Sequence, residues 1–265
     1  MRIVDNLYGL ILYYLKVREF DFQQIYKDKR VVVIGAANSV LDKELGGYID
    51  DFDIVIRFNK ALITYSLKNE RFLGKRTDIL IHNFHENLDD GGGGPVDWGV
   101  FDKFNLKYLV QAKSDISGKR NVFNYFKKYK SGSRSVYLVP TRTYSYIQKM
   151  FGSFTPTRGF LGIYLALNSQ AKEVYLTGFT FFKTDYADGY RDNIKSVSET
   201  LKHIDRQGFH DSELEFQNFL KILKKSQVKN IILDKALYRI VEQEETNNSK
   251  SYKSKSVRNI ESIFK

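Results

Sequence analysis

The sequence predicts an α/β fold, a single Rossmann-like domain in which helices flank a mostly parallel central sheet. From Lys29 onward, short runs rich in β-branched residues alternate with longer stretches of helical periodicity, which is typical of parallel strands joined by crossover helices. The short runs are mostly apolar, so we expect both faces of the sheet to be covered. A chain of 265 residues with 42% hydrophobic residues is long enough for one large domain with a full core.

The apolar runs and the helical periods define the expected elements. The expected strands are Arg30 to Ile34, Asp53 to Arg57, Asp78 to Ile81, Lys107 to Gln111, Ser135 to Val139, Glu173 to Thr177 and Asn230 to Leu233. The expected helices are Asn121 to Tyr129, Thr143 to Phe151, Phe160 to Ser169, Ser196 to His203 and Ser212 to Lys225.

We divide the chain into an N-terminal amphipathic segment (1–28), the α/β domain (29–241) and a basic polar tail (242–265). Charged residues interrupt the apolar N-terminal segment, and its longest run is shorter than the ~20 residues that cross a bilayer. This segment is either a helix packed on its own domain or one lying in a membrane interface. The tail carries five basic residues against Glu261 from position 250 onward, which predicts a solvated or disordered segment, with attachment to an anionic membrane as the alternative.

The charge balance restricts the partners. The chain has 42 basic and 31 acidic residues, a net charge of +11, which favours an anionic partner. We expect no nucleic acid, because the basic residues are spread along the chain without zinc-ligand spacing or an RNA-binding aromatic signature. The absence of cysteine excludes a disulfide scaffold and suits a reducing compartment. We therefore expect a cytoplasmic protein, with peripheral attachment to the inner membrane face as a further expectation.

The strand at Arg30 to Ile34 runs into a turn of small residues, Gly35-Ala36-Ala37-Asn38-Ser39. Such a turn lets backbone N–H groups and a following helix start approach a phosphate or nucleotide, although small residues here also serve close packing. The next strand ends in Arg57-Phe58-Asn59, at the sheet edge where ligands of α/β proteins bind. Arg57 either faces that ligand or pairs with a nearby aspartate, Asp50 or Asp53.

A second group of candidates lies between positions 155 and 179. Thr157 is expected to cap a helix whose first turn contains Arg158 and Gly159, which leaves N–H groups and a positive dipole end for an anion. A strand that ends in Gly178-Phe179 follows this helix.

The third group begins at His210. Ser212 and Glu215 fit a helix capping box, which by itself explains Glu215. His210 precedes the same helix start, where the positive potential disfavours an imidazolium, so we expect a neutral proton acceptor near pH 7. His82 and His85, beside Glu86, lack a firm third metal ligand, and we expect them to line the cleft without a metal. The glycine-rich stretch 89–95 is expected to be a surface loop, because no Lys-Ser/Thr follows it.

Taken in order, these segments resemble the sialyl motifs of glycosyltransferase family 29, the animal-type sialyltransferases. The stretch from Gly35 to Asn59 is similar to the large motif and the stretch from Thr155 to Phe179 to the small motif. The spacing of His210 and Glu215 is similar to the very small motif, and the segment from Gly74 to Thr77 is similar to one that follows the large motif.

The resemblance implies a donor site. It places CMP on Gly35, Asn38, Ser39 and Asn59, although Ala36 stands where the family has asparagine. Thr157 and Gly159 would face the donor near its sugar and phosphate. Arg158 stands where the family has threonine, and it would either pair with the donor carboxylate or phosphate or turn outward.

The resemblance also implies catalytic roles. His210 would be the general base, supported by Glu215, and His203 would contact the leaving phosphate, with Tyr186 or Tyr190 as alternatives. The fold would be the GT-A-like variant of the sialyltransferases.

The expected activity is inverting and metal-independent transfer of an acidic sugar, sialic acid by preference, from a CMP-activated donor to a hydroxyl of a glycan or glycolipid. The donor is a substrate, and no cofactor is expected. The missing cysteines depart from the animal enzymes and suggest a bacterial or viral member. Two alternatives stay open: a CMP-Kdo-dependent transferase of lipopolysaccharide or capsule synthesis, and an inactive module that binds nucleotide sugar or glycan.

Overall fold

The computed structural model describes residues 2–87, 92–185, 208–248, 251–252 and 256–264. Within these residues the chain forms a nine-stranded sheet with the strand order β1-β6-β5-β4-β3-β2-β7-β8-β9, in which every neighbouring pair is parallel. This confirms the predicted α/β fold. The strands are β1 (Val17–Glu19), β2 (Arg30–Ile34), β3 (Ile54–Phe58), β4 (Ile79–Ile81), β5 (Tyr108–Gln111), β6 (Val136–Leu138), β7 (Glu173–Thr177), β8 (Asn230–Leu233) and β9 (Val257–Asn259).

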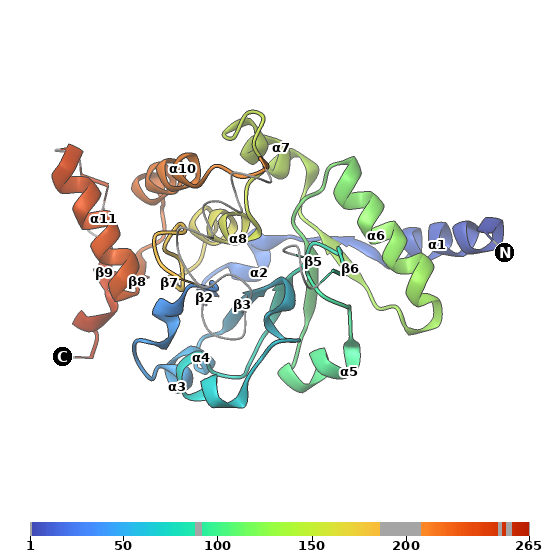
Figure 1. The fold of residues 1–265 in the computed structure, drawn as a ribbon, viewed down its shortest axis with the longest axis horizontal. Helices are drawn as coiled ribbons and strands as arrows, with labels where there is room; N and C mark the ends of the chain where they lie inside the picture. The colour runs from blue at the N-terminus through green and yellow to red at the C-terminus, as the bar shows by residue number, and fades with distance from the viewer. Residues whose placement is uncertain (1, 88–91, 186–207, 249–250, 253–255, 265) are drawn as a thin grey trace.

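Helices surround the sheet on both faces (Figure 1). The α-helices of the described residues are α1 (Arg2–Lys16), α2 (Phe22–Tyr26), α3 (Gly46–Asp50), α4 (Glu70–Leu73), α5 (Trp98–Phe101), α6 (Ile116–Tyr129), α7 (Thr141–Lys149), α8 (Arg158–Leu167), α10 (Ser212–Lys225) and α11 (Lys235–Asn248). The helix expected over Ser196 to His203 lies outside the described residues. In the described part of the chain, no helix combines the length and the hydrophobicity that crossing a membrane requires.

Alternating side chains of the strands build two apolar layers. The face that carries Val31 and Val33 packs against α2, α7, α8, α10 and α11. The opposite face, which carries Val32 and Ile34, packs against the segment that follows β2, against α3 and against the C-terminal segment. The runs are continuous in sequence because both layers exclude water, as expected for parallel strands.

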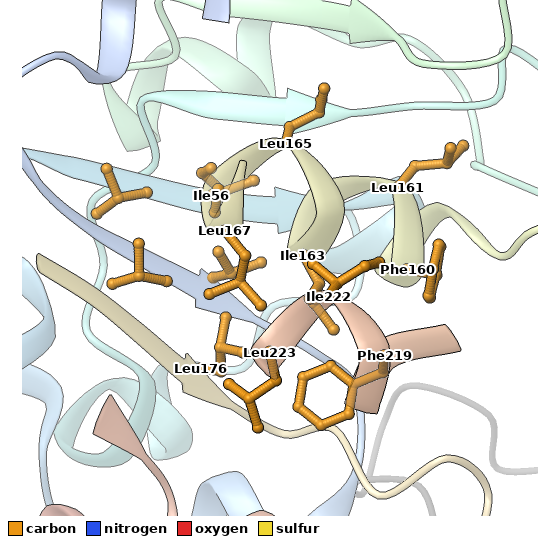
Figure 2. Packing of buried hydrophobic residues seen from close by; sticks show 14 of the residues in the cluster. Ile56, Phe160, Leu161, Ile163, Leu165, Leu167, Leu176, Phe219, Ile222 and Leu223 are labelled. Atoms are coloured by element: carbon orange, nitrogen blue, oxygen red, sulfur yellow. The ribbon is translucent and has the colours of Figure 1, made fainter. Parts of the chain in front are cut away.

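Helix α8 lies between the sheet and α10. Residues of α8, α10 and the strands form one apolar cluster, in which Figure 2 labels Leu167 of α8, Ile56 of β3 and Leu223 of α10. Apolar side chains cover both sides of α8, so its position is set by the sheet and by α10 together. The first turn of α8 is therefore held firmly at the sheet edge.

The strand order reverses at β2. The chain adds β3 to β6 in order on one side of β2 and then returns to its other side to add β7, β8 and β9. In α/β sheets, ligands bind beyond the carboxyl ends of the strands at such a switch point. The fold therefore places the expected crevice at the ends of β2 and β7.

Two glycines bring these strand ends together. The backbone N–H of Gly35 donates to the carbonyl of Thr177 at 2.7 Å, and Ala37 donates to the carbonyl of Gly178 at 3.0 Å. A side chain at Gly35 would collide with the Gly178 carbonyl, and Gly178 has a φ of +75°. Both positions require glycine for this approach and, at Gly178, for its backbone conformation.

The segment from Leu73 to Thr77 is held by hydrogen bonds from the side chains of Arg57 and Asp50. Arg57, which is 3% exposed, donates to the carbonyls of Leu73 and Gly74 at 2.6 and 3.0 Å and to Thr77 Oγ1 at 3.0 Å. Asp50 accepts from the backbone N–H of Lys75 at 3.0 Å (Oδ1) and 2.9 Å (Oδ2) and from the backbone N–H of Arg76 at 2.9 Å. Arg57 thus bonds neither Asp50 nor Asp53, because backbone carbonyls satisfy its guanidinium.

The C-terminal segment is part of the fold. Strand β9 pairs with β8, and Val257 and Ile260 are 8% and 3% exposed. The expectation of a solvated or disordered tail is therefore wrong for residues 256–264. Strands from both flanking segments, β1 and β9, join the sheet of the central domain.

Replacing Ile260 by alanine tests this packing. Ile260 belongs to an apolar cluster with residues of β2, α3 and β8, so Ile260→Ala should lower the free energy of unfolding by about 2 to 4 kcal/mol in urea denaturation. The control is Leu67→Ala at a side chain that is 74% exposed, where we expect a change within about 0.5 kcal/mol. Equal stability of Ile260→Ala and the unchanged protein would contradict this packing.

Candidate functional site

Two cavities flank the turn that follows β2. One, of about 100 Å³, is lined by residues that follow β2, by Thr157, by the segment from Gly178 to Phe182 and by Glu215. The other, of about 60 Å³, lies toward β3 and is lined by Gly35, Arg57 and Tyr65 among others. Ala36 lines both cavities. The small-residue turn thus separates two hollows at the carboxyl edge of the sheet.

Thr157 is the N-cap of α8, as predicted. Its Oγ1 accepts from the backbone N–H of Phe160 at 3.0 Å. A helix of ten residues begins here, so its remaining N–H groups and its positive dipole end lie next to Thr157, which lines the first cavity. This end of α8 is suited to an anion.

Glu215 reaches back to the same cap. Its carboxylate accepts from Thr157 Oγ1 at 2.7 Å and from the Thr157 backbone N–H at 3.0 Å. The side chain is 5% exposed, and burial raises the pKa of Glu215 to about 7, opposed by these two hydrogen bonds. The carboxyl group is therefore close to its titration midpoint at neutral pH.

The predicted capping box of α10 is wrong in both of its members. Asp211, not Ser212, is the N-cap, and its side chain accepts from the backbone N–H of Leu214 at 2.9 Å. Glu215 bonds Thr157, 58 residues away, instead of its own helix start. An aspartate directly before Ser212 takes the capping position, which frees Glu215 for a tertiary contact.

His210 lies on the strip of chain that joins these two helix starts. Its Nδ1 lies 2.6 Å from the carbonyl oxygen of Thr155, and the Thr155 backbone N–H donates to Phe209 at 2.7 Å. A carbonyl only accepts, so Nδ1 carries the proton of this hydrogen bond. In the neutral imidazole the lone pair is then on Nε2, which is the state that a general base requires.

The two hydrogen bonds of Thr155 and the two of Thr157 join segment 155–157 to segment 209–215. The structure thus brings His210, Thr157 and Glu215 together, which the sequence grouped only through its order of motifs.

Arg158 is turned into the protein. Its Nε is buried and has no hydrogen-bond partner among the described residues, and burial lowers the pKa of Arg158. Tyr144 and Asp115 are near enough to offset part of this effect. Of the two expected orientations, the outward one is therefore not the one observed. A partly buried cation with a buried, unsatisfied N–H at a helix start is suited to an anionic group of a ligand.

The other donor candidates lie around the turn after β2. Asn38 is exposed at the start of a 3₁₀ turn, and its backbone N–H donates to the carbonyl of Asp185 at 3.0 Å. Ser39 is buried and its hydroxyl donates to Asp234 at 3.1 Å, so this side chain serves the fold. Asn59, with a φ of +49°, accepts from the backbone N–H of Asn83 at 3.1 Å and links the ends of β3 and β4. Contacts of these residues with a donor stay predictions.

Gly159 packs under Phe179, whose ring would lie 3.0 Å from a Cβ at this position. The glycine therefore lets the loop after β7 approach the first turn of α8. Phe179 and the cap residue Thr157 both line the first cavity, so Gly159 supports its wall.

Asp234 is a buried carboxylate that sequence reasoning missed. It accepts from Ser39 Oγ, Thr177 Oγ1 and the Gly178 backbone N–H at 3.1, 3.1 and 2.7 Å, and it caps α11 through the backbone N–H of Leu237 at 2.8 Å. It thereby fixes the ends of β2 and β7. Its place directly after β8 was the available signal, because polar residues at that edge of a parallel sheet are often used by a site.

His82 holds a loop instead of lining a cleft. The ring is fully buried, its Nδ1 accepts from the Phe84 backbone N–H at 3.0 Å, and Nε2 lies 2.8 Å from the carbonyl of Gly93. Burial lowers the pKa of His82 to about 4, so the ring is neutral. His85 is exposed. Across the described residues, no three histidine, aspartate or glutamate side chains gather as a metal site.

His203, the residue predicted to contact the leaving phosphate, lies outside the described residues. The same holds for its alternatives, Tyr186 and Tyr190. These roles stay predictions.

Comparisons with known proteins point to one family. The model of glycosyltransferase family 29 (sialyltransferase) matches residues 3–91, which include the turn after β2. The type 2 lactosamine alpha-2,3-sialyltransferases of Homo sapiens and Pongo abelii are 26% identical to the chain over 224 residues, covering 78% of this chain. The chain spans 65% of the length of these relatives. Both are mammalian, so they do not support the expected bacterial or viral origin, nor the alternatives of Kdo, lipopolysaccharide or capsule.

The fold also has a solved counterpart. A crystal structure of a mammalian sialyltransferase in complex with Gal-beta-1-3GalNAc-ortho-nitrophenol aligns with a TM-score of 0.53 at 16% sequence identity. The alignment covers 84% of this chain and 77% of that one. At this identity the likeness concerns the fold alone.

The raised pKa of Glu215 predicts a pH dependence of stability. Between pH 4.5, its ordinary pKa, and pH 7, the folded state retains a proton that the unfolded chain has lost. The free energy of unfolding should therefore fall as pH rises through this window. Glu215 should contribute about 3 kcal/mol to this decrease. Glu215→Gln should remove that part of the slope in urea unfolding measured at several pH values.

Glu213→Gln is the matched control, because Glu213 is exposed on the same helix turn. We expect its pH profile to follow that of the unchanged protein. If Glu215→Gln and Glu213→Gln give the same profile, Glu215 does not titrate as the structure indicates.

Proposed function

We propose that the chain, which matches the model of glycosyltransferase family 29, is an inverting sialyltransferase that transfers sialic acid from CMP-sialic acid to a hydroxyl of a glycan or glycolipid. The observation that carries the proposal is the set of hydrogen bonds that fastens His210 and Glu215 to the segment leading into α8. It joins a proton acceptor to a helix start suited to a phosphate, at the switch point of the sheet.

His210 acts as general base in this proposal. Nε2 removes the proton of the acceptor hydroxyl while the oxygen forms its bond to the anomeric carbon of sialic acid. The bond between that carbon and the phosphate oxygen breaks, and CMP leaves with the electron pair. A single displacement of this kind inverts the configuration. The hydrogen bond from Nδ1 to the Thr155 carbonyl supports the step, since it orients the ring and stabilises the imidazolium that forms.

The start of α8 supports the leaving group. The phosphate of CMP gains negative charge as the bond breaks, and the free N–H groups and positive dipole end of α8 favour this charge. Thr157 is held for this task by Glu215, which fixes both its hydroxyl and its backbone N–H.

Arg158 provides a second cation for the donor. CMP-sialic acid carries a carboxylate and a phosphate, and either anion would satisfy the buried guanidinium N–H that has no partner among the described residues. A contact with the carboxylate would select donors with an acidic sugar, because a neutral sugar offers no carboxylate, whereas a contact with the phosphate would serve any CMP-sugar.

His210→Ala tests the general base. Loss of the proton acceptor should lower kcat for transfer from CMP-sialic acid by about 10²- to 10⁴-fold, measured with a panel of glycan acceptors. CMP binding in calorimetry should be retained, because the helix start remains. His85→Ala is the control: His85 is exposed, and its hydrogen bonds with Asn83 and Gly93 are made by its backbone, which alanine keeps.

Unchanged kcat in His210→Ala would sink the general-base assignment. Transfer from CMP-Kdo in preference to CMP-sialic acid would replace the donor. CMP binding without transfer to any acceptor would make the protein a binding module.

Arg158→Gln tests donor recognition. Loss of a charge-assisted hydrogen bond should raise KM for CMP-sialic acid by about 10- to 100-fold. If the affinity for CMP itself stays the same, the lost partner is the carboxylate; if it falls equally, the partner is the phosphate. The control is Arg142→Gln, at an exposed arginine of α7. An unchanged KM in Arg158→Gln would show that the donor does not use this cation.

A further inference from the structure

Helix α1 turns its apolar face away from the protein. The side chains on this face are between 46% and 84% exposed. They are Ile3, Val4, Leu7, Tyr8, Leu10, Ile11, Tyr14 and Leu15. At 100° per residue they occupy one arc, about 160° wide, of the helix surface. An exposed apolar surface of this extent marks a site of interaction.

The opposite face of α1 is fixed to the protein, partly by polar groups. Asp5 pairs with Lys130 at 2.6 Å, and Lys16 donates to the carbonyl of Ser133. Gly9 lies directly against Lys127, where a Cβ would collide with the lysine side chain. These contacts set the rotation of α1, so its apolar arc cannot turn inward without breaking them.

The support beneath this arc is rigid. Helix α1 packs against α6 and continues directly into β1, the edge strand of the sheet. It projects at one end of the molecule, with the N-terminus at the tip (Figure 1). The arc is therefore presented outward by a helix that is anchored to the sheet.

The helix that supports α1 is cationic. Helix α6 carries Lys119, Arg120, Lys127 and Lys128 and no acidic residue. Lys128 is paired with Glu86, and Asp5, the acidic residue of α1, is paired with Lys130. This charge suits an anionic surface. It disfavours a second copy of the chain, because like charges would meet across such an interface.

We propose that α1 lies in the interface of a membrane that contains anionic lipids. The apolar arc would enter the boundary of headgroups and acyl chains to a depth of about 5 to 10 Å, and the cations of α6 would meet the headgroups. With 15 residues, α1 is about 22 Å long, which suits a helix lying along the surface. The proposal does not depend on the proposed catalytic function.

Sedimentation with vesicles tests the proposal. The protein should sediment with phosphatidylcholine vesicles that contain about 30% phosphatidylserine, and more weakly with phosphatidylcholine alone. The double variant Leu7→Glu/Ile11→Glu should lose about a hundredfold in partitioning, because two apolar side chains become charged. Leu67→Glu, at an exposed leucine outside α1, should sediment like the unchanged protein. Circular dichroism melts should show that all variants fold.

A separate variant tests how much the cations of α6 contribute to membrane binding. Lys127→Gln should lose about fivefold in partitioning to the anionic vesicles and little to phosphatidylcholine, whereas Lys128 is left in place because it is paired with Glu86. His210→Ala should sediment like the unchanged protein, which separates this test from that of catalysis.

Three outcomes would overturn the proposal. One is no sedimentation of the unchanged protein with anionic vesicles. Another is equal sedimentation of Leu7→Glu/Ile11→Glu and Leu67→Glu. The third is that the unchanged protein does not bind vesicles and is a dimer in light scattering, whereas Leu7→Glu/Ile11→Glu is a monomer. The arc would then be an interface between copies of the chain.

Discussion

The contact of Glu215 with Thr157 is the interaction on which the candidate site depends. A buried carboxylate is costly unless it is hydrogen-bonded, and Glu215 is satisfied by the two N-cap donors of α8. The bonds of Thr155 to Phe209 and His210 run alongside it. Displacing segment 155–157 or segment 209–215 would therefore leave the buried carboxyl group of Glu215 without its hydrogen-bond donors. The orientation of His210 follows from this constraint, because its hydrogen-bond acceptor belongs to the fastened segment.

The sheet sets where this contact forms. Parallel strands all end at one edge, and the reversal at β2 opens the crevice between β2 and β7. Gly35 and Gly178 let the two strand ends meet, and Asp234 ties them to α11. The strand ends are thus held by Asp234 and the start of α8 by Glu215, and Glu215 and Thr157 both line the cavity that the ends of β2 and β7 also border.

How much could be predicted depended on the range of the interactions. Strands β2, β7 and β8 were predicted to the residue, because continuous apolar runs mark strands buried on both faces. Strands β1 and β9 were missed, because each has only three residues and includes charged side chains, so neither forms a continuous apolar run. The cap at Thr157 is local and was confirmed. The partner of Glu215 is 58 residues away, and a matching local pattern at Ser212 pointed elsewhere.

Burial alone does not distinguish a polar group that serves the fold from one that can bind a ligand. The distinction depends on whether the protein itself satisfies the hydrogen-bonding capacity of the group. The Asp234 carboxylate and the Nε of Arg158 are both buried at the carboxyl edge of the sheet. Asp234 accepts four hydrogen bonds from the fold, so its desolvation is offset within the protein. The Nε of Arg158 has no such partner in the described part of the chain. An anion bound at the start of α8 would supply the missing acceptor and offset the cost of burying this N–H.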